Sequence, residues 1–86
     1  MKKMDRQVIL NELKKVLIPY TLNKEALNNI NEQTDLIKDL KINSANLVDI
    51  IIDAENQYHI EIDMDSAEKM VNVGNCIDVI VEKMKK

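Results

Sequence analysis

Residues 40–58 read LKINSANLVDIIIDAENQY, and the rest of the chain is organised around this stretch. The pattern predicts a loop, a helix start at Asn43 or Ser44, and a helix that reaches about Tyr58. Ser and Asn are favoured at helix starts because their side-chain oxygens accept hydrogen bonds from amides that have no partner within the helix. We therefore expect the hydroxyl of Ser44 at the tip of this helix.

The predicted helix has a core face and a second apolar face. With about 100° of rotation per residue, the core face, which has Ile50 at its edge, comprises Leu47, Ile51, Ala54 and Tyr58. Off this face lie three more apolar residues and, beyond them, two carboxylates, namely Ala45, Val48, Ile52, Asp49 and Asp53. An apolar ridge with an acidic border is typical of a docking surface. The alternative is that a neighbouring helix or loop covers Val48 and Ile52.

Acidic residues concentrate around the same stretch. Between Ile42 and Glu68 there are seven acidic residues and no lysine or arginine, within a chain of net charge −3. Such a field attracts basic partners and speeds their encounter, although a charge block is often only a solvated face. Nucleic-acid binding is not expected, because the acidic charge and an aromatic content of 2% remove both usual sources of affinity.

Length and composition predict one small helical domain covering residues 1–86. The chain has no Phe or Trp and a single Gly and Pro, which is unusual for a β-rich fold with many tight turns. Cys76 is the only cysteine, so no intrachain disulfide is possible. The N-terminal residues 1–5 lack the apolar core of a signal peptide, and no apolar run is long enough to span a bilayer. We expect a soluble, cytoplasmic, all-α protein.

The remaining elements follow from helical spacing and capping residues. A first helix is predicted from about Asp5 to Leu17, where Pro19 prevents its continuation. The connection that follows contains a short turn of helix capped by Asn23 and, over residues 35–40, a second short helical piece. Its predicted anchors are Leu22, Leu27, Ile30, Leu36, Ile37 and Leu40.

Two further helices are predicted after an irregular link at residues 58–62. A short helix begins at residues 65–68, where an acid is followed three residues later by Glu, and ends near Met70. Asn72 caps the last helix, whose apolar stripe at helical spacing includes Val73, Cys76, Ile77, Ile80 and Met84. The position of Cys76 on this stripe predicts a buried thiol.

Several short motifs stand at fixed spacing around Ser44. Asp35-Leu36-Ile37-Lys38-Asp39-Leu40 precedes Asn43-Ser44, and further on come Tyr58-His59-Ile60-Glu61-Ile62, Ala67-Glu68-Lys69-Met70 and Val73. In this order, the segment from Thr34 to about Met84 resembles the acyl carrier proteins, the phosphopantetheine-bearing modules of fatty-acid and polyketide synthesis. The family's usual Asp-Ser-Leu is Asn43-Ser44-Ala45 here. Its glycine three residues before the serine is Lys41, and its proline after Ile62 is Asp63.

The resemblance implies a specialised, stand-alone carrier with no catalytic activity. Ser44 would hold 4′-phosphopantetheine, derived from coenzyme A, and the thiol of this arm would hold acyl groups as thioesters. The implied fold is a four-helix bundle with three longer helices and a short third helix. Acyl chains can retreat between the helices in this family, and the candidate lining residues are Leu47, Ile51, Ala54, Ile62 and Ile77.

The expected partners are a phosphopantetheinyl transferase and acyl-processing enzymes with basic docking patches, which a monomeric carrier would serve in turn. These enzymes would belong to fatty-acid or to polyketide or aryl-polyene pathways. The candidate docking residues are Asn43, Ala45, Val48, Asp49, Ile52, Asp53 and Glu55.

Two alternatives to this reading remain open at this point. Ser44 can be an ordinary capping serine, which would make the chain an unmodified helical adaptor that binds basic partners through its acidic helix. The second alternative is an aminoacyl or aryl carrier loaded by an adenylating ligase. No metal site is expected, because an EF-hand loop starting at Asp63 would lack the required residues at Ala67, Glu68 and Gly74. His59, the only histidine, cannot alone form a catalytic triad.

Overall fold

Three 12-residue helices form the body of the fold: α1 (Arg6–Leu17), α3 (Leu47–Tyr58) and α5 (Val73–Met84). The structure is a computed structural model and describes residues 5–85, so the residues before Asp5, which bear on the predicted localisation, lie outside it. Two five-residue helices, α2 (Lys24–Asn28) and α4 (Met64–Glu68), and a 3₁₀ turn, η1 (Ser44–Asn46), complete it. The predicted all-α bundle is confirmed.

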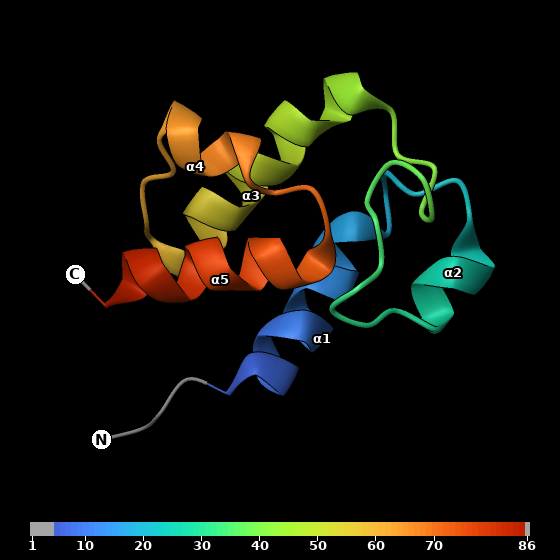
Figure 1. Ribbon diagram of the computed structural model, residues 1–86, viewed down its shortest axis with the longest axis horizontal. Helices are drawn as coiled ribbons and strands as arrows, with labels where there is room; N and C mark the ends of the chain where they lie inside the picture. Colours follow the sequence, from blue (N-terminus) through green and yellow to red (C-terminus); the bar gives the residue numbers. More distant parts are fainter. Residues whose placement is uncertain (1–4, 86) are drawn as a thin grey trace.

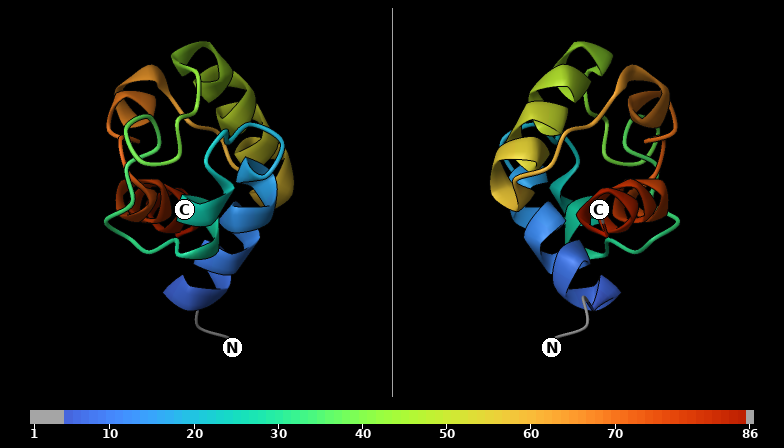
Figure 2. Two further views of the ribbon diagram at one scale, coloured as in Figure 1. Left: turned by 90° about the vertical axis from the view of Figure 1, so that its right-hand side faces the viewer. Right: turned by 90° about the vertical axis from the view of Figure 1, so that its left-hand side faces the viewer.

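The three long helices, α1, α3 and α5, all contact one another. Figure 1 shows α5 across the middle of the molecule, with α3 and α4 on one side and the N-terminal half of α1 on the other. Both views of Figure 2 place α1 and α3 along one side of the molecule and α4 and α5 along the other. Within residues 5–85 the structure has no strand beyond an isolated bridge between Asp35 and Asn72. No helix in that range is long and apolar enough to cross a membrane.

Local side-chain caps explain where most helices begin. Asp5, Asn23 and Asn72 each precede a helix and accept a hydrogen bond from an amide of its first turn, which confirms the predicted caps at Asn23 and Asn72. The helix that ends at Tyr58 is followed by His59 in a left-handed conformation, with a φ of 55°. This conformation turns the chain sharply and lets the amides of His59 and Ile60 bond to the carbonyl of Glu55.

The core is aliphatic and gathers side chains from all parts of the described chain. Its fully or nearly fully buried members include Ile9, Leu13, Leu17, Leu36, Leu40, Ile42, Ile50, Val73, Cys76, Ile77 and Ile80. The prediction of a buried thiol at Cys76 is confirmed, and burial raises the pKa of this thiol to about 12. A thiol in this state is a packing group and not a nucleophile.

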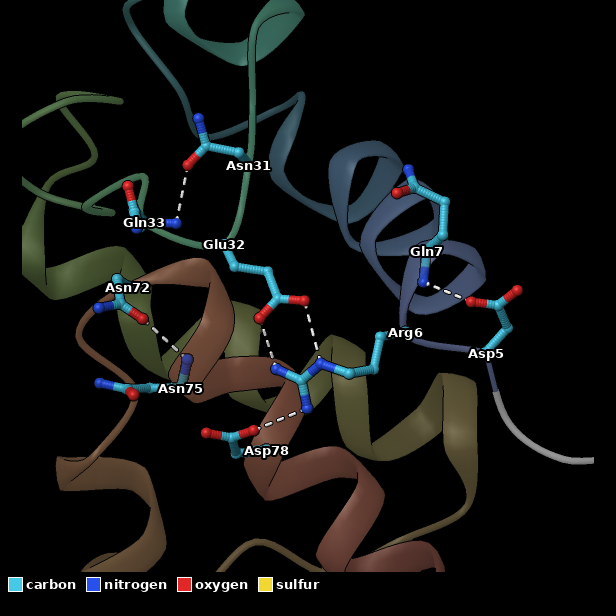
Figure 3. Close-up of polar contacts among 9 residues, drawn as sticks. All are labelled: Asp5, Arg6, Gln7, Asn31, Glu32, Gln33, Asn72, Asn75 and Asp78. Atoms are coloured by element: carbon cyan, nitrogen blue, oxygen red, sulfur yellow. Dashed lines mark hydrogen bonds and ion pairs between the residues drawn. The ribbon is translucent and has the colours of Figure 1, made fainter.

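Polar contacts join segments that are distant in sequence. The Arg6 guanidinium of α1 makes a bidentate pair with Glu32, at 2.6 and 3.0 Å, and a further bond of 2.8 Å to Asp78 of α5 (Figure 3). The hydroxyl of Tyr58 donates to Glu12 at 2.6 Å, which links α3 to α1. Burial and this bond both raise the pKa of Tyr58.

Several sequence predictions about the connections are wrong. Residues 35–40 form turns and not a helix. The amides of Ile37 and Lys38 bond to the side chain of Asp35, and the amide of Leu36 bonds to the carbonyl of Val71. Of the predicted anchors, Leu22 is 82% exposed and Ile37 45% exposed, whereas Leu27, Leu36 and Leu40 are buried and Ile30 is half-buried.

The short fourth helix, α4, also differs from its prediction. It begins at Met64, after Asp63, and ends at Glu68, whereas the spacing of acidic residues indicated a start at residues 65–68 and an end near Met70. The carboxylate of Asp63 forms an ion pair of 2.8 Å with the ammonium group of Lys83 in α5. This tertiary contact fixes the position of the helix start, and no local spacing could indicate it.

Candidate functional site

Ser44 lies at the surface, at the first residue of η1. The turn continues directly into α3, so Ser44 stands at the N-terminal tip of one helical segment. Asn43, and not Ser44, caps this segment: its Oδ1 accepts a hydrogen bond of 2.9 Å from the amide of Ala45. Within residues 5–85 the structure gives the Ser44 hydroxyl no hydrogen bond. The reading of Ser44 as an ordinary capping serine is therefore wrong.

An apolar ridge follows Ser44 along the outer side of α3. Val48 is 60% exposed and Ile52 47% exposed, and Ala45 is also exposed. No element within residues 5–85 covers Val48 and Ile52, so the alternative of a neighbouring helix or loop over them is wrong for this part of the chain. The two side chains lie one helical turn apart and share a face.

Carboxylates flank this ridge on both sides, and two of them have structural partners. Asp53 accepts a hydrogen bond of 2.9 Å from the hydroxyl of Tyr20, and this bond raises the pKa of Tyr20. On the other side, Glu55 accepts a bond of 2.8 Å from the amide of Ile62. Asp49 is exposed. The acidic border is thus held in place by the loop after α1 and by the link before α4.

The inward face of α3 is rotated relative to the prediction. Ile50, expected at the edge, is almost fully buried, as is Ala54, whereas Leu47, Ile51 and Tyr58 are half-buried. The reason is that α1 and α5 both pack against α3. The five-residue helix α4 is too short to cover the remaining core face completely.

A small apolar cavity lies between α3, α4 and the turn at residues 36–39. Its volume is about 20 Å³, and its walls are Leu36, Leu47, Ile50, Ile51, Ala67 and Met70. The predicted lining residues Leu47 and Ile51 are therefore at the cavity. Ala54 and Ile77 are fully buried but do not line it, and Ile62 lines a separate, open hollow beside Lys83.

The residues that sequence reasoning missed at the cavity are those contributed by neighbouring segments. Leu36 and Met70 are apolar in the sequence, but nothing local places them against Leu47 and Ile51. Their positions depend on the bond from the Leu36 amide to the Val71 carbonyl, which brings the turn next to the end of α4. Ala67 faces the same space from α4 itself.

Within residues 5–85 no three side chains of the kind that bind metal ions come together. Asp63, in the acidic stretch that follows α3, is instead paired with Lys83, and this bond holds the pKa of the Asp63 carboxyl well below its usual range.

Known proteins with a similar sequence share one description. The chain is 33% identical to the acyl carrier protein of Desulforapulum autotrophicum over 69 aligned residues. The aligned region covers 80% of this chain and 90% of that protein. The chain is also 31% identical to the acyl carrier protein of Lactobacillus acidophilus over 78 aligned residues, and this region covers 90% of this chain and 94% of that protein. No model of a known protein family matches the chain.

A solved structure shows the same fold. It is that of the acyl carrier protein from Enterococcus faecalis, with a TM-score of 0.73 over 93% of this chain and 99% of that chain, at 24% identity. The helical bundle described above is thus the fold of a known carrier protein. With its sequence relatives, the chain belongs to the acyl carrier proteins. Members of this family are carriers without catalytic activity, so the chain is not an enzyme.

Proposed function

We propose that Ser44 carries a 4′-phosphopantetheine arm and that the chain, as one carrier domain, presents acyl thioesters on this arm to separate enzymes. In the loading step, the Ser44 oxygen bonds to the phosphorus that bears the pantetheine, and adenosine 3′,5′-bisphosphate leaves from coenzyme A. The hydroxyl proton passes to a base of the transferase. The observation that carries the proposal is the exposed Ser44 hydroxyl, left free because Asn43 caps the helix.

The position of Ser44 suits a phosphodiester. Amide groups and the positive end of the helix dipole at the N-terminus of η1 and α3 favour a bound phosphate. The arm itself supplies the reactive thiol, while this chain's residues position it and provide the surface that enzymes recognise. This division of roles agrees with the inert character of the buried Cys76 thiol.

The ridge of Ala45, Val48 and Ile52 with Asp49 and Asp53 is the proposed docking surface for basic enzymes. Exposed apolar side chains supply the buried centre of such an interface, and the flanking carboxylates supply its charged rim. Asn43, beside Ser44, lies within the same surface. Glu55 adds a further carboxylate, which its bond to the amide of Ile62 holds in place. If the Asp49→Lys and Ile52→Glu variants are served by every partner enzyme at the wild-type rate, this assignment fails.

The cavity beside α3 favours a hydrocarbon cargo. Its six lining side chains are all apolar and offer no hydrogen-bonding partner for a polar or aminoacyl group. At about 20 Å³ it can take only a methyl-sized group without opening, so a longer chain must separate α4 from α3. Fatty-acyl loading should shift the methyl NMR signals of Leu47, Ile51 and Met70, whereas shifts confined to surface residues would count against an internal cargo site.

Intact-mass measurement tests the loading step. The wild-type chain, incubated with coenzyme A and a phosphopantetheinyl transferase, should gain the mass of one phosphopantetheine, and the Ser44→Ala variant should not. An unchanged wild-type mass would instead favour the unmodified adaptor. A gain that survives in Ser44→Ala would place the arm elsewhere.

A further inference from the structure

The two tyrosines of the chain make similar contacts between the α1 region and α3. Tyr58, the last residue of α3, donates its hydroxyl to Glu12 of α1 at 2.6 Å. Tyr20, in the loop after α1, donates its hydroxyl to Oδ2 of Asp53 in α3 at 2.9 Å. The two helices are therefore antiparallel, because residues farther along α1 and its loop meet residues farther back along α3. Figure 2 shows both helices along the same side of the molecule.

A lysine of α1 approaches Asp53 from the side opposite to Tyr20. Lys15 and Asp53 line one open hollow of about 390 Å³, whose other walls are Val16, Pro19, Asn56 and Gln57. Lys15 precedes Tyr20 in the chain and therefore meets α3 beyond Asp53, in the half of the helix that lies away from Ser44. Tyr20 lies on the other side: the bond to Asp53 raises its pKa, and the carboxylate of Asp49, one turn closer to Ser44, adds to this effect.

The backbone around Tyr20 holds the phenol in a fixed place. The amides of Tyr20 and Thr21 both bond to the carbonyl of Leu17 at 3.0 Å, and the Thr21 hydroxyl donates to the carbonyl of Leu40 at 2.7 Å. The ring of Tyr20 is half-buried and packs against the aliphatic core. A side chain fixed in this way can position a carboxylate, whereas a long, exposed lysine side chain loses more conformational entropy when it does so.

The bond to Tyr20 fixes Asp53 without cancelling its charge. A phenol is a neutral donor, so the carboxylate keeps its negative charge, whereas an ion pair with Lys15 would neutralise it. Within residues 5–85 Asp53 forms no ion pair with Lys15 or with any other cation, although the two side chains line the same hollow. The hydroxyl of Tyr20 takes only Oδ2, so Oδ1 of Asp53 can accept a hydrogen bond from a partner protein.

We propose that Tyr20 is a positioning residue of the docking surface: its hydroxyl holds the Asp53 carboxylate away from Lys15 and keeps it available to a basic side chain of the transferase. This inference rests on the proposed function, in which Asp53 belongs to the docking surface. Without the hydroxyl, Asp53 turns across the hollow and pairs with Lys15. A carboxylate paired within the chain attracts a basic partner less, because the lysine cancels its charge and the partner has to displace that lysine.

The two tyrosines provide a matched pair of variants. Tyr20→Phe and Tyr58→Phe each keep the ring and remove one hydroxyl that donates to a carboxylate. Loading from coenzyme A is measured with a phosphopantetheinyl transferase that loads the wild-type chain, and kcat and the KM for the carrier are determined separately. Urea unfolding followed by circular dichroism gives the stability of each variant.

A positioning role and a purely structural role predict different kinetics. We expect Tyr20→Phe to raise KM about threefold at an ionic strength of about 0.01 M, with kcat unchanged, and this effect to shrink at about 0.5 M salt. Tyr58→Phe should leave KM at the wild-type value even where it lowers stability. A purely structural role of Tyr20 would lower stability and leave KM unchanged in both variants, and this result would overturn the proposal.

Lysine variants test the competing ion pair. In the Tyr20→Phe background, Lys15→Gln removes the competing cation and should return KM close to the wild-type value. Lys14→Gln removes the same charge at a neighbouring lysine that does not line the hollow, and it controls for the general effect of charge. If both replacements lower KM equally, Asp53 does not turn to Lys15, and the proposal is overturned.

Asp53→Asn separates failure of this inference from failure of the proposed function. It should raise KM at least as much as Tyr20→Phe does, and Tyr20→Phe should add nothing in this background, because Tyr20 acts through Asp53. A full further loss in the double variant would overturn the inference alone. A wild-type KM for Asp53→Asn would remove Asp53 from the proposed docking surface, and the inference with it. A wild-type chain that gains no phosphopantetheine would refute the proposed function itself.

Discussion

The Oδ1 of Asn43 accepts a hydrogen bond of 2.9 Å from the amide of Ala45, across the residue between them, Ser44. The residue that caps the helix and the residue proposed to be modified are therefore neighbours with separate roles. If Ser44 were the cap, its hydroxyl would be engaged with the backbone, and modification would remove the cap. With Asn43 in that role, a phosphodiester on Ser44 leaves the helix start intact.

Asn43→Ala should destabilise the protein by about 1 kcal/mol, the usual effect of losing a side-chain cap. The loss is measured as a lower midpoint in urea unfolding followed by circular dichroism. Asn43→Asp is the matched control, because its carboxylate keeps an oxygen at the capping position and adds a negative charge at the helix N-terminus. Equal losses in the two variants would show that the bond to Ala45 contributes nothing.

Lys41→Gly should stabilise the protein by about 1 kcal/mol, because glycine adopts a φ of 58° without the clash that lysine has. The measurement is the free energy of urea unfolding. Lys38→Gly serves as control, since Lys38 does not have a positive φ, and this variant should not be stabilised.

Gly74→Ala should destabilise the protein by about 1–3 kcal/mol, although alanine is the better helix former by about 1 kcal/mol. A Cβ at Gly74 would lie 2.9 Å from the carbonyl oxygen of Glu32, which also accepts a 2.7 Å hydrogen bond from the Gly74 amide. Thermal unfolding of Gly74→Ala and of the neighbouring Asn75→Ala compares the two sites. A Gly74→Ala variant as stable as the wild type would show that the segment at Glu32 moves freely.

The pair formed by Asp63 and Lys83 should make stability depend on pH at the acidic end. Lys83, and to a lesser degree Ser66, lowers the pKa of the Asp63 carboxyl from its ordinary value of about 3.8. A carboxyl with a lowered folded-state pKa adds stability above about pH 4, and this contribution is lost as the pH falls toward the folded-state value. Asp63→Asn should therefore be less stable than the wild type at pH 7 and approach it in strong acid. A difference that stays constant with pH would refute an ionic role.

Local chemistry explains which parts of the fold the sequence could predict. The helix starts at Asp5, Asn23 and Asn72 depend on a side chain and an amide two or three residues away, so the residue types alone identify them. The burial of Ile50 depends on how α1 and α5 pack against α3. The exposure of Leu22 and Ile37 depends on the absence of a covering element in the described chain. Such long-range facts have no local signature.

The candidate site divides in the same way. The position of Ser44 at a helix tip, the apolar ridge and its acidic border follow from helical periodicity. The bonds from Tyr20 to Asp53 and from Ile62 to Glu55 join residues 33 and seven positions apart, and no spacing rule indicates them. The same holds for the share of the cavity wall that Leu36 and Met70 contribute.

Mapping the modified residue tests the central claim most directly. Ser44 and Ser66 are the only serines, and both lie between Lys41 and Lys69, within one tryptic peptide. Fragmentation of that peptide after loading with coenzyme A and a transferase therefore has to distinguish them. We predict that the added mass is on Ser44, which is exposed, and not on Ser66, which is buried. A peptide that carries no added mass, or that carries it on Ser66, would contradict the account.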